Sequence, residues 1–220
     1  MISACVVVLN RMQVDTVQTY GAALRSKAAE EERWKDGSFV LLQLVNGLKT
    51  LQAQGIEEAP LSLSNFVLCR EERDPQSRLC ILHVLGVGLA SEGGSLCQCA
   101  LAALKELLPD AALTPLVSDL LRSERAVSLS QVKSVLEFSL WGPMDVALGT
   151  PLSDRELVLQ RWLDLERATV LHGLVHTRVE LTAFEECHLL FLVRTAAKML
   201  CEASVLLDSN SSSAPEMTSF

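Results

Sequence analysis

The chain has 220 residues, of which 49% are hydrophobic, so it is long enough to bury a substantial core. Its formal net charge of −8 argues against a nucleic-acid partner, because binding phosphates needs a clustered basic face and the basic residues here are scattered. Aromatic residues make up only 5%, whereas Leu, Ala, Val, Glu and Lys dominate, which predicts a mainly α fold. Seven cysteines, an odd number in mostly apolar surroundings, indicate reduced core thiols in a cytosolic protein.

Two apolar stretches are too short to cross a membrane. The first, residues 1–9, carries neither a basic leader nor a small-residue cleavage site, so we expect a buried strand or the start of a helix there. The other, residues 189–193, is flanked by charged residues and is typical of a protein core. The sequence therefore predicts no membrane span.

Two helices are predicted first along the chain. Residues 15–33 are expected to form an exposed helix that ends in a solvated run of charges. A second helix begins near Asp36 or Ser38, either of which can cap it, and its leucines and valines lie largely on one side. We expect this helix to stop at Gly55.

A β-hairpin is predicted next, from two short segments rich in Leu, Val and Ile that a polar segment separates. These strands cover residues 61–68 and 79–85. A passage rich in Gly and Ser then leads into a predicted helix over residues 96–108. Thr114 followed by Pro115 opens another helix, since the missing N–H of proline costs nothing at the first helical position.

The later helices are marked by capping boxes, in which a Ser or Thr is followed three residues later by Glu or Gln. Ser128 with Gln131 predicts a helix that runs through Trp141. Residues 143–150 are expected to be a loop.

Two further capping boxes open long helices, Ser153 with Glu156 and Thr182 with Glu185. The apolar residues of these helices cover more than one face. A second partner, from this chain or another, is needed to cover them. Residues 208–220 are rich in serine and are predicted to be disordered.

Residues 43–68 resemble the helix and catalytic loop of protein kinases, H-R-D-L-x-x-x-N followed by apolar residues. The Leu and Asn of that motif match Leu61 and Asn65. Its His, Arg and Asp fall on Glu58, Ala59 and Pro60. Because proline has no carboxylate to take the proton of a substrate hydroxyl, the resemblance implies that the catalytic base is lost.

The metal-binding D-F-G of a kinase would lie near the end of the second predicted strand. It falls either on the triplet that begins with His83 or on the triplet that begins with Gly86, and neither contains an aspartate. The lobe that clamps ATP would precede residue 1, so we expect the chain to start near the kinase hinge with the N-terminal lobe absent. We therefore predict a protein that is not an enzyme and uses no cofactor or metal.

Residues 161–168 resemble the helices that follow the pseudokinase core in the PEAK/pragmin family, where such helices join a preceding one in a dimerisation module. The resemblance implies a kinase-like C-terminal lobe with a short β-hairpin over residues 1–142, a helical dimerisation extension over 143–207 and a disordered tail over 208–220. The expected interface residues are large and apolar: Trp141, Leu157, Leu159, Trp162, Leu163, Leu189 and Phe191.

The function implied by this resemblance is that of an inactive scaffold. We expect homodimers, or heterodimers with related pseudokinases, that assemble signalling adaptor proteins. The expected location is the cytoplasm, in association with the cytoskeleton, with a role in the actin cytoskeleton, cell shape and motility. The alternative is an unrelated all-α enzyme or small-ligand binder whose kinase-like spacing is accidental, and it would require a pocket with converging titratable groups.

Two other spacings are weak indications of metal sites. Cys97 and Cys99 are one residue apart and cannot reproduce a C-x2-C knuckle, so buried thiols are expected. His172 and His176 could share a helix face, but a zinc-protease motif needs a glutamate where Gly173 stands. We therefore expect no metal centre at either place.

Overall fold

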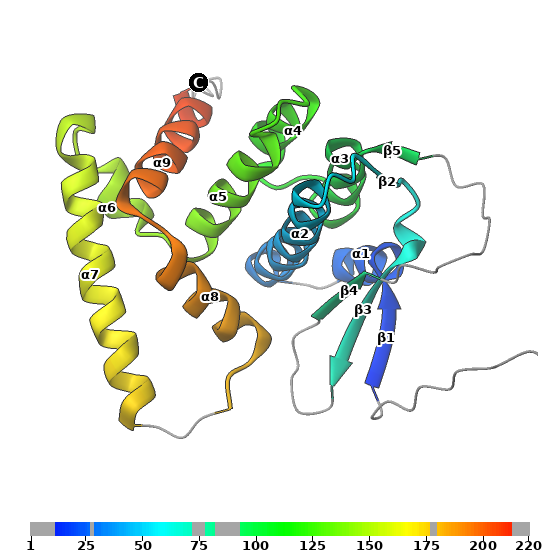
Figure 1. Ribbon diagram of the computed structural model, residues 1–220, viewed down its shortest axis with the longest axis horizontal. Coiled ribbons are helices and arrows are strands. Elements are labelled where there is room, and N and C mark those ends of the chain that lie inside the picture. The colour runs from blue at the N-terminus through cyan, green and yellow to red at the C-terminus, as the bar shows by residue number, and fades with distance from the viewer. Residues whose placement is uncertain (1–11, 27–28, 72–77, 82–92, 177–179, 213–220) are drawn as a thin grey trace, which may run out of the picture.

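The computed structural model describes residues 12–26, 29–71, 78–81, 93–176 and 180–212. These residues form mostly helices, with two small antiparallel sheets, which confirms the prediction of a mainly α fold. Figure 1 shows the sheets at one end of the molecule and the long helix α7 at the other, with the remaining helices between them. None of the helices in the described part of the chain is both long and apolar enough to cross a membrane.

A strand opens the described part of the chain. β1 (Met12–Thr16) pairs antiparallel with a later strand, β3 (Phe66–Glu71). α1 (Val17–Arg25) follows directly, because the Thr16 hydroxyl accepts a hydrogen bond from the Thr19 backbone N–H and caps the helix. The helix predicted over residues 15–33 is thus confirmed only for residues 17–25. It has a buried face instead of being fully exposed, and the charge run at its predicted end belongs to the next helix.

α2 (Glu30–Ala53) is the long helix at the centre of the molecule (Figure 1). It begins before the predicted Asp36 or Ser38, and the charge run forms its first turn, where carboxylates interact favourably with the positive end of the helix dipole. It ends as predicted before Gly55, whose φ of 79° suits glycine. Its fully buried residues include Leu41, Leu44, Val45 and Leu48.

The predicted hairpin is confirmed. β3 (Phe66–Glu71) pairs antiparallel with β4 (Arg78–Ile81), and β1 lies on the other side of β3. β3 begins later than residue 61 because a 3-10 turn, η1 (Leu63–Asn65), precedes it. The end of the second predicted strand, residues 82–85, lies outside the described residues.

The second sheet has two strands, β2 (Glu58–Pro60) and β5 (Gly93–Ser95). β5 runs directly into α3 (Leu96–Leu107), which confirms the helix predicted after the Gly/Ser-rich passage. Ser95 caps α3: its hydroxyl accepts a hydrogen bond from the Gln98 N–H, and the Gln98 amide oxygen accepts one from the Ser95 N–H. The capping box thus gives partners to two backbone N–H groups at the point where the strand becomes a helix.

α4 (Thr114–Arg122) and α5 (Ser128–Trp141) confirm two further predicted helices, and α4 has its proline in the first turn as expected. The capping box of Ser128 with Gln131 is not formed. Ser128 already lies inside α5, and its hydroxyl accepts a hydrogen bond from the Arg125 N–H instead.

The predicted loop over residues 143–150 contains a short helix, α6 (Met144–Leu148), so that prediction is wrong. Ala147 of α6 is buried, which explains why the turn is helical rather than open. α7 (Leu152–His176) then begins one residue before Ser153, so Ser153 is its second residue and not its cap.

α8 (Ala183–Arg194) begins with the capping box predicted at Thr182. α9 (Ala197–Ser212) completes the described chain. The prediction of a disordered tail is wrong for residues 208–212, which continue α9. The rest of the predicted tail, residues 213–220, lies outside the described residues.

One hydrophobic core joins the two predicted parts of the chain. α2 packs on α3 and α5, α5 packs on α9, and α9 packs on α7. The core therefore continues from α2 through α5 to Leu159 and Leu163 of α7 and Leu200 of α9. The boundary predicted at residue 142 falls at the turn after α5 and not at a gap in the core.

Two helix glycines are expected to respond to alanine in opposite directions. A Cβ at Gly37 would lie 2.9 Å from the Leu107 carbonyl oxygen, whereas a Cβ at Gly173 would meet nothing within 4 Å. Alanine stabilises an open helix by about 1 kcal/mol relative to glycine, but overpacking costs about 1–3 kcal/mol. We expect Gly173→Ala to raise, and Gly37→Ala to lower, the free energy of unfolding measured in urea. A stabilising Gly37→Ala would contradict the close approach of α2 to α3.

Candidate functional site

The loop that resembles a kinase catalytic loop is held by backbone pairing. In β2, Ala59 lies opposite Gly94 and Pro60 lies opposite Gly93. Ala59 is buried, whereas Glu58 is exposed. η1 and β3 then carry the chain into the hairpin. The position of the loop backbone is thus fixed by the second sheet on one side and the first sheet on the other.

The residues of this loop offer little chemistry. Glu58 is the only titratable residue at the three positions that correspond to the kinase His, Arg and Asp, and Pro60 stands at the position of the base. Asn65 ends η1 directly before β3, in the order that the kinase motif requires. His83 and Gly86, the two candidates for the D-F-G position, lie outside the described residues.

A cavity of about 580 Å³ opens beside this loop, between α1 and α3. The carboxylate of Glu106, one of its polar groups, already accepts a hydrogen bond from Arg25 at 3.1 Å. Among the described residues that line this cavity there is no His, Cys or Asp, so it offers hydrogen bonds but no nucleophile beside a base. The polar lining consists of Gln18, Ser62, Gln98, Lys105 and Glu106.

A second cavity, of about 550 Å³, lies where the ends of α1 and α3 meet the start of α2. Its apolar wall includes Trp34 and Leu108, and its charged lining includes Glu30 and Arg33. Charges of both signs give it no evident preference for an anion or a cation. It too lacks a paired nucleophile and base among its described lining residues.

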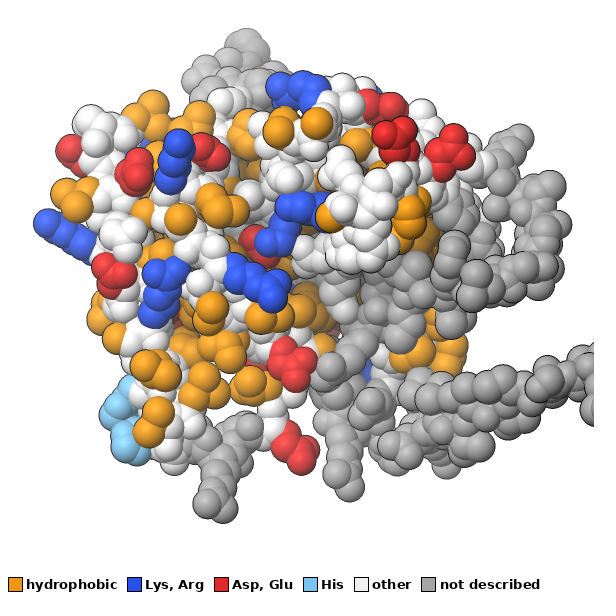
Figure 2. Space-filling model, in the orientation of Figure 1, with side chains coloured by type: hydrophobic (Ala, Val, Ile, Leu, Met, Phe, Trp, Pro, Cys, Tyr) orange, Lys and Arg blue, Asp and Glu red, His pale blue; other side chains and the backbone are white. Residues whose placement is uncertain are grey.

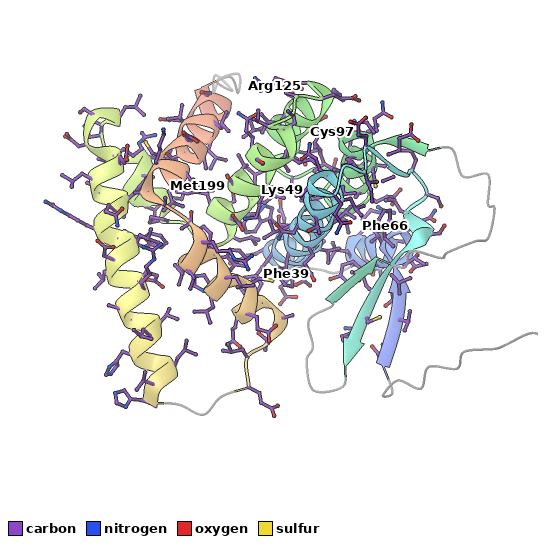
Figure 3. All side chains as sticks on the ribbon, viewed as in Figure 1. Phe39, Lys49, Phe66, Cys97, Arg125 and Met199 are labelled. Atoms are coloured by element: carbon purple, nitrogen blue, oxygen red, sulfur yellow. The ribbon has the colours of Figure 1, made fainter. Side chains whose placement is uncertain are left out.

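Cys97 and Cys99 of α3 are buried thiols, as predicted, and Figure 3 labels Cys97 on that helix. Burial raises the pKa of Cys99 to about 12, and burial, with a smaller contribution from the Glu124 carboxylate, raises the pKa of Cys97. Both therefore keep their protons at neutral pH and are poor nucleophiles and metal ligands. Within the described residues, no cluster of three or more His, Cys, Asp and Glu side chains could hold a metal ion.

An aromatic junction docks α8 on α5 and α2. Trp141 stacks on His188 with ring centroids 5.5 Å apart and meets Phe184 edge-on at 5.3 Å. Phe39 of α2, labelled in Figure 3, lies 5.2 Å from Phe184. Burial lowers the pKa of His188, with a smaller opposing effect of the Glu166 carboxylate, so this imidazole is neutral at neutral pH. Trp141, a predicted interface residue, is therefore engaged in internal packing.

The other predicted interface residues differ in exposure. Leu159, Leu163 and Phe191 are buried in the core of this chain, so they are internal packing residues and their assignment to an interface is corrected. Leu157 is exposed. The half-buried members of the set are Trp141, Trp162 and Leu189.

α7 carries a second apolar stripe, opposite the one that it buries. With 3.6 residues per turn, spacings of eleven, three and four residues return to one side of a helix. On α7 this side presents Leu157, Ala168, Leu171 and Val175, which we call the outer stripe, with the charged Arg161 and Asp164 between the first two. The exposed fractions are 57% for Leu157, 63% for Leu171 and 72% for Val175. Figure 2 shows hydrophobic side chains gathered at the lower left, where α7 and α8 lie in Figure 1.

Arg155 fastens the start of α7 to α9 from inside the protein. It is only 3% exposed and donates hydrogen bonds to the Thr150 carbonyl at 3.1 and 3.2 Å and to the Ser204 hydroxyl at 3.2 Å. It also donates to the Asp208 carboxylate at 3.1 Å. Sequence reasoning missed this residue. One sequence signal was available. Arg155 lies four residues before Leu159, so both residues belong to the same face of the helix, and an arginine on an otherwise apolar face could have indicated a buried contact.

Arg167 makes a similar attachment farther along α7. Its guanidinium donates hydrogen bonds to the carbonyls of Leu192 and Thr195, each at 2.7 Å. These carbonyls lie at the end of α8, where helix carbonyls lack partners within the helix. Arg167 therefore holds the turn between α8 and α9 against α7.

Comparison with known proteins identifies no relative. No protein-family model matches the sequence, and no curated protein matches it. Two features of the described residues remain for a functional argument: the loop of β2 and η1, where Glu58 is the only titratable residue at positions 58–60, and helices α7–α9 with the outer stripe.

Proposed function

We propose that the protein is a non-enzymatic, protein-kinase-like scaffold of the PEAK/pragmin type that pairs with a second copy of itself through α7 and its neighbours. The observation that carries the proposal is the outer stripe of α7. An apolar stripe on the solvent side of a helix that already buries its other side calls for a second partner.

The order of elements around the degenerate loop supports the kinase-like part of the proposal. A long helix, α2, leads to β2 and η1, and an antiparallel hairpin follows with Asn65 at its start. A kinase places its catalytic base between such a helix and hairpin. Pro60 at that position supports a protein that does not transfer phosphate.

The second copy is the occupant that best fits the outer stripe. A two-fold interface brings the same patch of both subunits together, so an apolar patch is complementary to itself. Arg161 and Asp164 lie on the same side of α7, with opposite charges three residues apart, so two stripes crossing each other can also pair their charges. By the resemblance, related pseudokinases could replace the second copy.

The direct test is the mass of the chain in solution. At micromolar concentration, light scattering behind a sizing column is expected to give twice the 24.0 kDa of the single chain. A monomer under these conditions would contradict the proposal. The cellular part of the proposal depends on this dimerisation. It comprises the assembly of signalling adaptors and the control of the actin cytoskeleton, cell shape and motility in the cytoplasm. They are tested by expressing a monomeric variant in cells and scoring cell spreading and movement.

The missing base and metal ligand also predict how the protein responds to nucleotide. We expect Mg²⁺-ATP at millimolar concentration to leave the melting temperature unchanged relative to Mg²⁺ alone. A nucleotide present at 100 times its dissociation constant would stabilise the native state by about 2.7 kcal/mol, which is a shift of several degrees for a chain of this size. A shift of that magnitude would show that a nucleotide site persists.

A further inference from the structure

Two histidines stand side by side at the end of α7. His172 and His176 are four residues apart, and their ring centroids are 4.4 Å apart with the ring planes at 64°. Both side chains are exposed. Figure 2 shows histidine side chains projecting at the lower left edge of the molecule. They lie beside the outer stripe and not on it, because 100° per residue places them on the next sector of the helix.

Against the expectation from the sequence, which considered only a zinc-protease motif at these histidines, we propose that this end of α7 is a chelating site for a divalent transition-metal ion, with the imidazoles of His172 and His176 as its two protein ligands and water in the remaining positions. Zinc–imidazole bonds are about 2.0–2.1 Å long, so two ligand nitrogens on one tetrahedral ion lie roughly 3.3 Å apart. Two rings with centroids 4.4 Å apart can meet that spacing by rotating their side chains. Imidazole ligands suit zinc, copper and nickel rather than magnesium or calcium.

The surroundings of the pair favour a cation. His176 is the last residue of α7, where the helix dipole is negative and the final carbonyls lack partners within the helix. Among the described residues, the recorded contact of each histidine is with the other. Both imidazoles are exposed, and a Cβ at Gly173 between them would meet nothing within 4 Å, so there is open space beside the pair. An ion can therefore approach with its water shell and exchange two waters for imidazoles.

The site binds metal without catalysing hydrolysis. A zinc hydrolase needs a glutamate base beside its first histidine, and Gly173 occupies that position. Two protein ligands, compared with the three of catalytic zinc sites, also give an open and exchangeable site. The inference therefore concerns metal binding alone, and it stands whether or not the chain dimerises.

Ni²⁺ is the probe of choice, because half-buried thiols such as those of Cys187 and Cys201 would compete for Zn²⁺. In calorimetric titration of the full chain we expect one Ni²⁺ per chain. His172→Ala and His176→Ala are each expected to weaken binding at least about tenfold, because a single imidazole loses the chelate. Both positions are exposed, so the variants are expected to fold, and circular dichroism checks this.

A matched control keeps two histidines and changes only their spacing. Combining His172→Ala with Leu171→His places the second imidazole about 140° around the helix from His176. This variant is expected to bind as weakly as the single substitutions. The proposal is overturned if the wild-type chain binds no Ni²⁺, if both alanine variants bind as the wild type does, or if the respaced variant retains full affinity.

Discussion

Replacing Leu171 and Val175 together by glutamate is expected to convert the proposed dimer into a monomer. Both residues belong to the outer stripe and are largely exposed in the single chain. Pairing would bury each side chain with a gain of about 1.5–3 kcal/mol, and glutamate would replace that gain with the cost of burying unpaired carboxylates. We expect the dissociation constant of the dimer to rise at least about a hundredfold, or about 2.8 kcal/mol. Light scattering and analytical ultracentrifugation over a range of micromolar concentrations measure it.

The control for this variant is Val14→Glu. Val14 is an exposed valine of β1, at the opposite end of the molecule from α7. It should leave the dimer intact, which separates a loss of the interface from a general effect of added negative charge. The double variant should unfold at nearly the wild-type denaturant concentration once both are monomeric. A dimer that persists in the double variant would show that the outer stripe is not the contact.

Helices whose first turn carries a local sequence signal could be predicted from the sequence. Pro115 in the first turn of α4 and the capping box at Thr182 each depend on residues only a few positions apart. The strand β1 could not be predicted in this way, because it is defined by its pairing with β3, which lies more than fifty residues later in the chain. The five residues of β1 are too few for their alternation of apolar and polar side chains to indicate a strand locally, and only the distant partner decides.

The candidate interface was also hard to predict, because it depends on contacts between residues that are far apart in the sequence. An excess of leucine on α7 predicts that the helix is apolar on more than one side, but the pattern does not say which side faces the core. Leu157 and Leu159 looked equivalent in the sequence, yet one is exposed and the other is buried. The direction is set by what α7 packs against, namely α9 and the arginine contacts that join them.

Arg155→Ala is expected to give the largest loss of stability among single substitutions in the extension. The change leaves the Thr150 carbonyl without its two hydrogen bonds from Arg155, removes the hydrogen bond to the Ser204 hydroxyl, which keeps its own bond to the Cys201 carbonyl, and opens a cavity between α7 and α9. Unsatisfied buried groups cost about 1–3 kcal/mol each. We expect the free energy of unfolding to fall by about 3 kcal/mol, measured in urea, and backbone amides of α9 to exchange faster with deuterium.

Matched substitutions separate the roles of geometry and charge at this position. Arg194→Ala removes an exposed arginine at the end of α8, outside the outer stripe, and should change stability by less than about 0.5 kcal/mol. Arg155→Lys keeps the charge, but an ammonium group lacks the planar fork that reaches three partners, so it should recover less than half of the loss. Asp208→Asn removes only a half-exposed ion pair and should cost less than about 1 kcal/mol. If Arg155→Ala were as mild as Arg194→Ala, α7 would be held by its leucines alone, and the backbone amides of α9 would exchange no faster than in the wild type.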